Sequence, residues 1–351
     1  MKILITGNLG YVGPVVCRHL RKALPGATLV GYDTGYFTDC CTVKSLEAAD
    51  KPHEQITGDM RDISPAVLQG FDAVLHLAAL SNDPMGQKFE RVTQEVNLEA
   101  SVRLGHLAKE QGVRHFVFAS SCSVYGLDDG SLKTEESQVQ PLTAYARSKI
   151  GTEEALQLLA NDRFVVTALR FATACGFSPR CRLDLVLNDF VASALSTGKI
   201  TLLSDGTPWR PLIHVQDMAR AMEWALSRRT DQGGDFLAVN AGSDTWNYQV
   251  RELAEAVAEG LGGLPVELNA QSGPDKRSYR VDFRRFRELA PHHQPQWHLA
   301  RTVEELRAGL LPVIQKNMVF RDSAWIRLRV LSQLMDSGKL GADLRWLSAD
   351  C

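Results

Sequence analysis

Residues 5–13 read ITGNLGYVG and come directly after the apolar start of the chain. Three glycines in this stretch each suit a mechanical task. Gly7 suits a tight turn, Gly10 close approach of the backbone to a pyrophosphate, and Gly13 close packing of a helix on a strand. The spacing is GxxGxxG rather than GxGxxG. Its position between a strand and a helix N-terminus nevertheless predicts a site for the phosphates of a dinucleotide.

The rest of the first half repeats this alternation of short apolar runs and longer segments of helical period. The runs are continuous and rich in Val, Ile, Leu and Phe, as in parallel strands that helices cover on both faces. We expect strands at 2–6, 28–33, 54–59, 72–78, 115–120 and 164–171, and helices at 11–23, 88–112 and 143–160. This order predicts an α/β fold with a Rossmann-type doubly wound parallel sheet.

After residue 171 the pattern loosens, which favours a smaller C-terminal substrate domain that interleaves with the first. PLIHVQD and DFLAVN still read as strands, and we expect helices near 185–198, 216–229, 247–262 and 301–317. The expected parts are a cofactor-binding domain at 1–171 with returning segments at about 211–240, a discontinuous substrate-binding domain at 172–317 and a helical tail at 318–351. The tail is amphipathic. We expect it to pack on its own domain rather than on a partner, and no function follows from its pattern.

Composition excludes several classes of function. Lys and Arg total 39 against 41 for Asp and Glu, so bulk charge favours neither nucleic acid nor a membrane as a partner. The seven cysteines are scattered, with no paired CxxC at zinc spacing, so we expect free thiols in a reducing cytoplasm and no metal site. We expect neither a secretory signal nor a membrane-spanning helix.

Two carboxylates follow the second and third expected strands. Asp33 lies twenty residues past Gly13, where a carboxylate can accept hydrogen bonds from both ribose hydroxyls of an adenosine. It would repel a 2′-phosphate, which favours NAD over NADP. Asp59 is a plausible contact of the adenine ring, with Met60 packing beside it. The alternative for each acid is an ordinary cap at a strand end.

TAYARSKI carries Tyr145 and Lys149 four residues apart, on one face of an expected helix. A free tyrosine has a pKa near ~10, so its use as a base near neutral pH costs about 4 kcal/mol unless the site lowers that pKa. A nearby ammonium and a cationic nicotinamide ring would both lower it. The YxxxK pattern alone is common, and its place in a dinucleotide-binding fold gives it meaning.

These motifs together resemble a family. ITGNLGYVG, Asp33, GDMRD, HLAALS, FASSCSVYG, YARSK and RPLIHVQDMARA occur in the order seen in extended short-chain dehydrogenases/reductases. Over roughly residues 1–310 the chain resembles their NAD-dependent nucleotide-sugar epimerase/dehydratase branch. The resemblance implies NAD as cofactor, a nucleotide-diphosphate sugar as substrate and a homodimer built on a four-helix interface.

The resemblance also implies roles for individual residues. Ser121 matches the serine that hydrogen-bonds the reacting sugar hydroxyl, Tyr145 the base, and Lys149 the residue that binds the nicotinamide ribose and lowers the tyrosine pKa. Cofactor contacts are expected at Gly7, Gly10, Tyr11, Val12, Gly13, Asp33, Asp59, Met60, Leu77, Ala78, Ala79, Asn97, Tyr145 and Lys149. Substrate contacts are expected at Ser81, Ser121, Cys122, Ser123, Tyr145, Thr173, Arg210 and Arg277, the two arginines gripping the diphosphate.

Three positions near the expected site bear on the chemistry. Thr173 stands three residues after Arg170, where the family often has Asn. Cys122 and Ser123 replace the Asp-Glu pair of the 4,6-dehydratases, so dehydration lacks an acid to deliver its proton. The Cys122 thiol is either a tuned acid or base or, as we favour, a small residue packed behind Ser121. Ser120 is expected to bond the backbone.

Three functions remain open from the sequence. The favoured one is redox-neutral epimerisation of a nucleotide sugar through a transient ketone. The alternative is an NAD(P)H-dependent ketoreductase of a nucleotide-activated 4-keto sugar, which Asp33 disfavours because net reduction in biosynthesis usually draws on NADPH. A cofactor-binding scaffold with idle catalytic residues is disfavoured by the complete set of Ser121, Tyr145 and Lys149.

Overall fold

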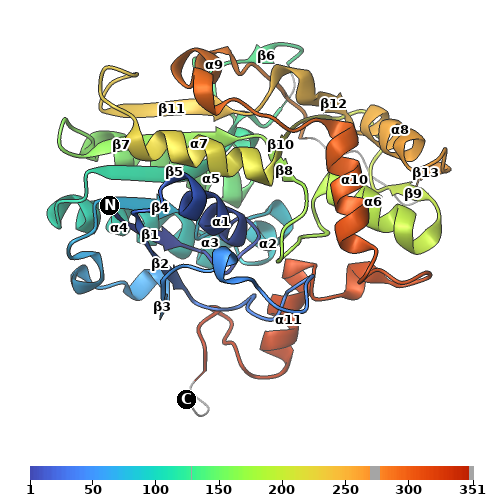
Figure 1. Ribbon diagram of the computed structural model, residues 1–351, viewed down its shortest axis with the longest axis horizontal. Helices are drawn as coiled ribbons and strands as arrows, with labels where there is room; N and C mark the ends of the chain where they lie inside the picture. The colour runs from blue at the N-terminus through green and yellow to red at the C-terminus, as the bar shows by residue number, and fades with distance from the viewer. Residues whose placement is uncertain (128, 269–276, 348–351) are drawn as a thin grey trace.

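The computed structural model of the protein describes residues 1–127, 129–268 and 277–347. Its centre is a seven-stranded sheet in the order β11-β7-β5-β4-β1-β2-β3 (Figure 1). Every neighbouring pair in it is parallel. The strands are β1 (Lys2–Thr6), β2 (Thr28–Asp33), β3 (Glu54–Thr57), β4 (Ala73–His76), β5 (His115–Ser121), β7 (Val165–Phe171) and β11 (Phe236–Ala241). The predicted doubly wound α/β fold is confirmed, and the order reverses between β1 and β4, where such folds bind ligands.

Helices cover both faces of this sheet because successive strand residues point to opposite sides. Ile3 and Ile5 face a core that includes Leu20, whereas Leu4 faces a second core that includes Leu104. The first core lies under α1 (Gly13–Ala23) and α7 (Val215–Ser227), and the second under α4 (Ala100–Glu110) and α5 (Ala144–Leu159). The strands therefore read as continuous apolar runs.

The helix predicted at 88–112 is wrong in its start and its continuity. The segment consists of α2 (Asp83–Lys88), α3 (Glu90–Thr93), a π-helical segment η4 (Gln94–Glu99) and α4. Asn82 starts α2 early by accepting a hydrogen bond from the Met85 N–H at 2.9 Å. The chain then breaks at Phe89, whose φ of −123° and ψ of 50° are not helical.

Three smaller sheets lie outside the central one. β8 (Thr173–Cys175), β10 (Trp209–His214) and β12 (Asn247–Gln249) form one, β9 (Ile200–Leu202) and β13 (Val266–Leu268) another, and β6 (Leu132–Lys133) and β14 (Arg280–Val281) the third. Of the two strands expected to return, DFLAVN joins the central sheet as β11. PLIHVQD forms β10, which pairs with β8 instead.

The remaining elements are short or surround these sheets. The helices are α6 (Val186–Thr197), α8 (Val250–Gly260), α9 (Arg284–Leu289), α10 (Leu299–Leu310) and α11 (Arg327–Asp336). Single turns of 3-10 helix lie at η1 (Ala48–Asp50), η2 (Met60–Asp62), η3 (Pro65–Leu68), η5 (Cys122–Tyr125), η6 (Asp244–Trp246), η7 (Pro291–His293) and η8 (Phe320–Asp322). Within the described residues, no helix is both long and apolar enough to cross a bilayer.

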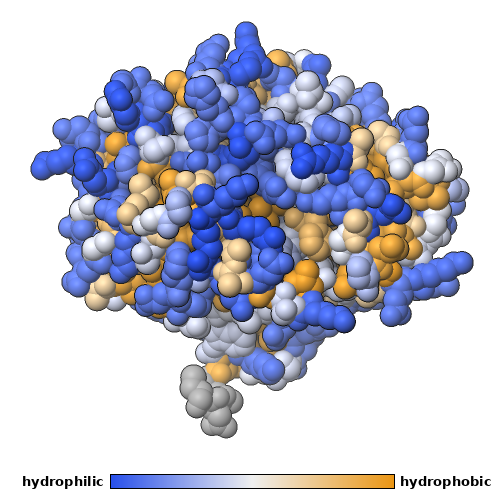
Figure 2. Space-filling model, in the orientation of Figure 1, coloured by the Kyte–Doolittle hydropathy of each residue, from blue (hydrophilic) through white to orange (hydrophobic). Residues whose placement is uncertain are grey.

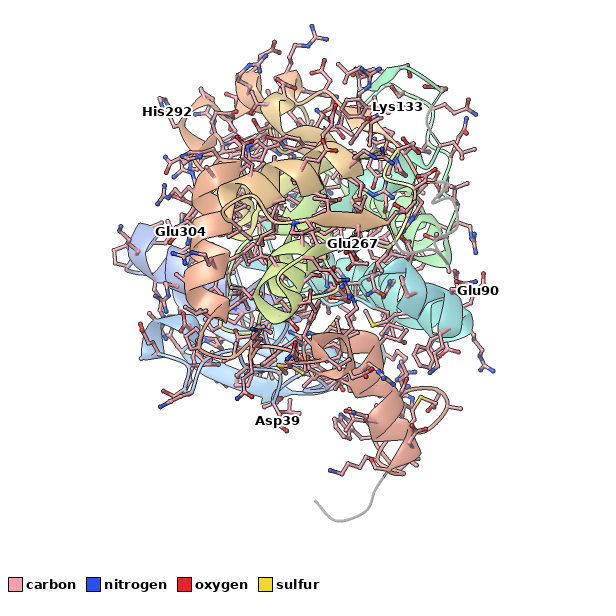
Figure 3. All side chains as sticks on the ribbon, turned by 90° about the vertical axis from the view of Figure 1, so that its right-hand side faces the viewer. Asp39, Glu90, Lys133, Glu267, His292 and Glu304 are labelled. Carbon is pink, nitrogen blue, oxygen red and sulfur yellow. The ribbon has the colours of Figure 1, made fainter. Side chains whose placement is uncertain are left out.

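The C-terminal tail packs onto the first domain. Leu331, Leu340 and Leu344 form a separate buried cluster with residues of the α2–α3 region, among them Met85 and Phe89. Figure 3 shows α11 beneath the helices beside Glu90, and Figure 1 shows the same segment under the central sheet. Figure 2 shows a face of mainly hydrophilic residues, with apolar ones gathered in small patches.

Candidate active site

A single cavity of about 850 Å³ holds most of the residues expected to contact ligands. It runs from the glycine loop after β1, past the carboxyl ends of β2, β4 and β5, to residues of β8 and β10. The tail also contributes to its wall. A cavity of this size suits a small organic ligand, and its position is the strand-order switch of the sheet.

The glycine loop packs so closely that side chains would not fit. Gly7 has a φ of +72°, and a Cβ there would lie 2.6 Å from the Ala78 Cα. A Cβ at Gly13 would lie 1.9 Å from the Asn8 carbonyl oxygen, so Gly13 serves helix packing behind the cavity wall. Gly10 lies in the wall, together with Tyr11 and Val12. Backbone therefore meets the cavity directly, as phosphate binding requires.

Asp33 ends β2 and fixes the glycine loop. Its carboxylate accepts the Leu9 N–H at 2.9 Å and the Gly35 N–H at 2.8 Å. Burial raises the pKa of Asp33, while those two donors and the Arg180 charge act in the opposite direction. The carboxylate lies in the cavity wall, where it can accept hydrogen bonds from ribose hydroxyls.

Asp59 and Met60 lie in the wall beyond Asp33. Arg61 holds the Asp59 carboxylate through its backbone N–H at 2.8 Å and its guanidinium at 2.6 Å. The pKa of Asp59 is lowered by these Arg61 contacts, which outweigh burial. An ionised acid beside an apolar Met60 offers an acceptor and a packing surface for an adenine ring.

Leu77, Ala78 and Ala79, at the end of β4, line the cavity as expected. Asn97 does not lie among the lining residues. It is buried in the π-helical segment, where its Oδ1 accepts the Leu80 N–H at 2.8 Å and its Nδ2 donates to the Leu80 carbonyl at 3.0 Å. The structure shows Asn97 supporting the Leu80 backbone, which does line the cavity, and the expected cofactor contact of Asn97 stays a prediction.

Ser121, Tyr145 and Lys149 all line the same cavity. Thr143 caps α5 by accepting the Ala146 N–H at 3.1 Å, and this cap starts the helix just before Tyr145. A hydrogen bond joins the side chains of Ser121 and Tyr145. β5 and α5 thereby bring a serine and a tyrosine hydroxyl together at the bottom of the cavity.

The protein groups around Tyr145 raise the pKa of its phenol rather than lower it. Burial raises its pKa to about 12, and the Asp83 carboxylate acts in the same direction. The hydrogen bond with Ser121 and the charge of Arg182 act in the opposite direction. The chain's own groups leave this phenol protonated at neutral pH, so further positive charge is needed for proton abstraction.

Lys149 is buried at the centre of the site. Its Nζ donates to the Ala119 carbonyl at 2.7 Å and lies 4.6 Å from the Phe118 ring centre. Burial lowers its pKa to about 7, and the nearby Glu153 carboxylate opposes that shift. Lys149 can therefore change its charge near neutral pH.

Glu153 forms a buried network behind Lys149. Arg170 contacts its carboxylate with two nitrogens, at 2.7 Å and 3.1 Å. Ser120 also donates to Glu153, so the expectation that Ser120 bonds the backbone is wrong. The acid thus fixes β5 and β7 against α5, one turn beyond Lys149.

Cys122 and Ser123 differ in their surroundings. Cys122 is 1% exposed, lies outside the lining residues and has its Sγ 3.1 Å from the Arg170 carbonyl. Burial raises the pKa of its thiol. This burial favours the packing role of Cys122, and its expected substrate contact stays a prediction. Ser123 lines the cavity, and its buried Oγ has no hydrogen-bond partner among the described residues.

The far end of the cavity holds the other expected substrate residues, Ser81, Thr173, Arg210 and Arg277. Arg210 donates to the Arg277 carbonyl, and Arg277 forms an ion pair with Asp83. Ser81 accepts a hydrogen bond from Arg182 at 2.9 Å. Two arginines thus lie together at the end away from the glycine loop, as binding of a second diphosphate would require.

Several wall residues carried no recognisable signal in the sequence. Arg182 and Asp184, after β8, form a two-point ion pair in the cavity wall. Ile326, Arg327 and Leu344 reach the wall from the tail. SPRCRLD could have been noted as a charged cluster after a strand, whereas the tail residues depend on long-range docking.

The fold and this site define a class: dinucleotide-binding enzymes with a serine, tyrosine and lysine at the end of a Rossmann-type sheet. The profile of the NAD dependent epimerase/dehydratase family matches residues 3–242. The chain belongs to this family, which uses NAD as its cofactor. The resemblance stated from the motifs is thereby confirmed.

Relatives and solved structures agree with this assignment. The UDP-glucose 4-epimerase of Corynebacterium glutamicum is 28% identical over 294 residues, covering 78% of this chain and 85% of that protein. That of Mycolicibacterium smegmatis is 28% identical, covering 88% and 99%. The structure of a Stenotrophomonas maltophila UDP-glucose 4-epimerase with NAD and formylated UDP-arabinopyranose is 25% identical, with a TM-score of 0.71 over 88% of this chain and 98% of that one. MoeE5 in complex with UDP-glucose and NAD has a TM-score of 0.75 at 24% identity, covering 90% and 100%.

Proposed function

We propose that the protein epimerises a nucleotide-diphosphate sugar through a transient keto intermediate, with Tyr145 as the base. The observation that carries this proposal is the meeting of Ser121, Tyr145 and Lys149 in one cavity with the glycine loop. A redox-neutral reaction needs the cofactor site and the sugar site to be continuous, because the same cofactor must act twice on one bound sugar.

In this proposal Ser121 holds the reacting sugar hydroxyl and Tyr145 removes its proton. The Lys149 ammonium stabilises the phenolate and holds the nicotinamide ribose. NAD, when bound, would supply a hydride acceptor that can return the same hydride to the other face of the ketone. Tyr145 returns the proton at the end, so the enzyme is unchanged.

The substrate is proposed from the second end of the cavity. Arg210 and Arg277 lie there in the wall, and their planar guanidinium groups suit a diphosphate. Curated relatives are named UDP-glucose 4-epimerases, so a UDP-hexose is the first candidate. Cys122 and Ser123 offer no acid for loss of water, which disfavours dehydration.

A homodimer is also proposed, as family resemblance implies. Leu158, on the expected interface helix α5, is 86% exposed and is a candidate contact with the partner copy. The cytoplasm remains the expected compartment, because six cysteines are described as free thiols.

The test begins with the purified protein. NAD released by denaturation is measured by absorbance and mass, and the protein is then incubated with UDP-glucose and other nucleotide sugars without added reductant. Epimer formed by the wild type and lost in Tyr145→Phe supports the proposal. Turnover of a 4-keto sugar only with added NADPH would replace it with the ketoreductase alternative.

A further inference from the structure

We propose that the tail at 318–347 forms the outer wall of the NAD site, with Arg327 supplying positive charge for the cofactor's diphosphate and Leu344 covering its adenosine. The inference rests on NAD binding in the cavity described above. The family profile ends at residue 242, so the match to the family does not include this wall.

Arg327 is the first reason for the inference. Its side chain lies in the cavity wall although the residue is only 2% exposed. The guanidinium donates to the carbonyls of Arg180 at 2.7 Å, Cys181 at 3.3 Å and Ala324 at 3.1 Å. Across the described part of the chain, no carboxylate lies within 4 Å of it. A buried cation without an acid is costly.

An anion in the cavity would remove that cost. Asp184 is an acid whose charge acts on Arg327. Two guanidinium nitrogens of Arg182 already bind its carboxylate. Burial lowers the pKa of Arg327, as expected for a cation that lacks compensation. The glycine loop lies in the wall of the same cavity as Arg327, and its backbone suits phosphate. A planar guanidinium and backbone N–H groups in the wall of one cavity suit a diphosphate.

Leu344 is the second reason for the inference. The loops that carry Asp33 and Asp59, the two acids expected to contact the adenosine, hold the backbone around Leu344 in place. Tyr36, in the loop after Asp33, donates its hydroxyl proton to the Leu344 carbonyl. The Trp346 Nε1 donates to the Thr34 carbonyl at 2.8 Å. Leu344 itself is fully buried and lies in the cavity wall.

The loop after β3 holds the tail in the same way. Arg61, which binds the Asp59 carboxylate, also donates to the Asp343 carbonyl at 2.9 Å. The tail therefore bridges the two loops that flank the expected ribose and adenine positions. It would have to move before a bound adenosine could leave on that side.

The test measures cofactor release from the holoenzyme. Arg327→Gln and Leu344→Ala are each expected to release NAD about tenfold faster than wild type. Arg329→Gln and Leu347→Ala, on the outside of the same tail, are matched controls and are expected to release NAD within twofold of the wild-type rate. The Arg329 side chain is 52% exposed, and Leu347 is 52% exposed. Release is followed by trapping free NAD with an excess of a coupled dehydrogenase.

Binding of two probes separates the two roles. Arg327→Gln should weaken ADP-ribose about tenfold and leave adenosine unchanged, whereas Leu344→Ala should weaken both. Arg327→Lys, which keeps the charge, should stay within about threefold of wild type. Release as fast in the Lys as in the Gln variant, or unchanged release in both Arg327→Gln and Leu344→Ala, would overturn the inference. Wild-type protein that binds no NAD would instead overturn the cofactor assignment itself.

Discussion

Lys149 places its ammonium 5.5 Å from the centre of the Tyr145 ring, one turn along the same helix. Burial acts on the two groups in opposite directions, lowering the pKa of Lys149 to about 7 and raising that of Tyr145 to about 12. As pH rises, the first proton therefore leaves the pair from Lys149. Groups this close titrate as a unit.

The state of the pair that has lost one proton includes the active form, in which Tyr145 is the phenolate and Lys149 the ammonium, so the pH profile of kcat/KM should follow that first proton. In wild type it is expected to rise through a pH of about 7, or below if the bound cofactor adds positive charge. Lys149→Met removes this proton, so the rise should move toward the tyrosine pKa, with activity at pH 7.5 at least a hundredfold lower and partly recovered at pH 9.5. Lys109→Met on α4 is the control. An unchanged profile in Lys149→Met would contradict the coupling.

Ser123→Ala should separate binding from stability. The Oγ of Ser123 is buried and finds no hydrogen-bond partner within 1–127, 129–268 and 277–347, a condition that costs about 1–3 kcal/mol. The variant is therefore expected to melt at the same temperature as wild type or higher, while kcat/KM for the nucleotide sugar falls about tenfold. Ser131→Ala, on the surface, serves as the control. Full activity in Ser123→Ala would show that its hydroxyl does not contact the sugar.

Cys122→Ala should keep turnover within a few-fold of wild type, because a buried thiol with a raised pKa supplies no thiolate. Its loss from a packed core should lower the free energy of unfolding by about 1 kcal/mol. Tyr145→Phe, which should be nearly inactive, is assayed in parallel so that the loss of turnover in Cys122→Ala can be compared with the loss of a catalytic group. Equal losses in the two variants would make the thiol a chemical participant.

Glu153→Gln should destabilise the protein strongly. The change leaves buried Arg170 without its acid, and breaking such a pair costs about 3–5 kcal/mol. Urea unfolding of the variant should give a clearly lower midpoint, with Glu154→Gln on the exposed side of α5 unchanged. Matching midpoints for the two variants would mean that the buried network adds nothing to stability.

Local pattern predicted the central sheet well because each strand is buried on both faces and so reads as one apolar run. It failed across Phe89 and the π-helical segment, because the spacing of apolar residues there continues unbroken. The π-helical segment carries Asn97, whose amide pairs with the backbone of Leu80, seventeen residues earlier. No window of local sequence contains that pair.

The candidate site also contains residues that local motifs predict and residues that only long-range contacts bring into place. Ser121, Tyr145 and Lys149 could be predicted since their motifs lie at strand and helix ends of a recognisable fold. Arg327 and Leu344 could not, because their places depend on contacts such as that of Trp346 with Thr34, 312 residues apart. The buried acid Glu153 was equally hidden, since a charged residue in a helix normally marks the solvated face.

The seven central strands run in one direction, so the ligand cavity lies at the edge of the sheet where they end. The edge where they begin lies on the other side of the sheet. Gly26 and Gly70 lie in turns on the side where strands begin, and open space surrounds the position of a Cβ at each. A tether, dye or inserted peptide at Gly26, whose backbone accepts any residue, would leave the ligand entrance untouched. The enzyme can thus be immobilised in one orientation with its chemistry facing outward.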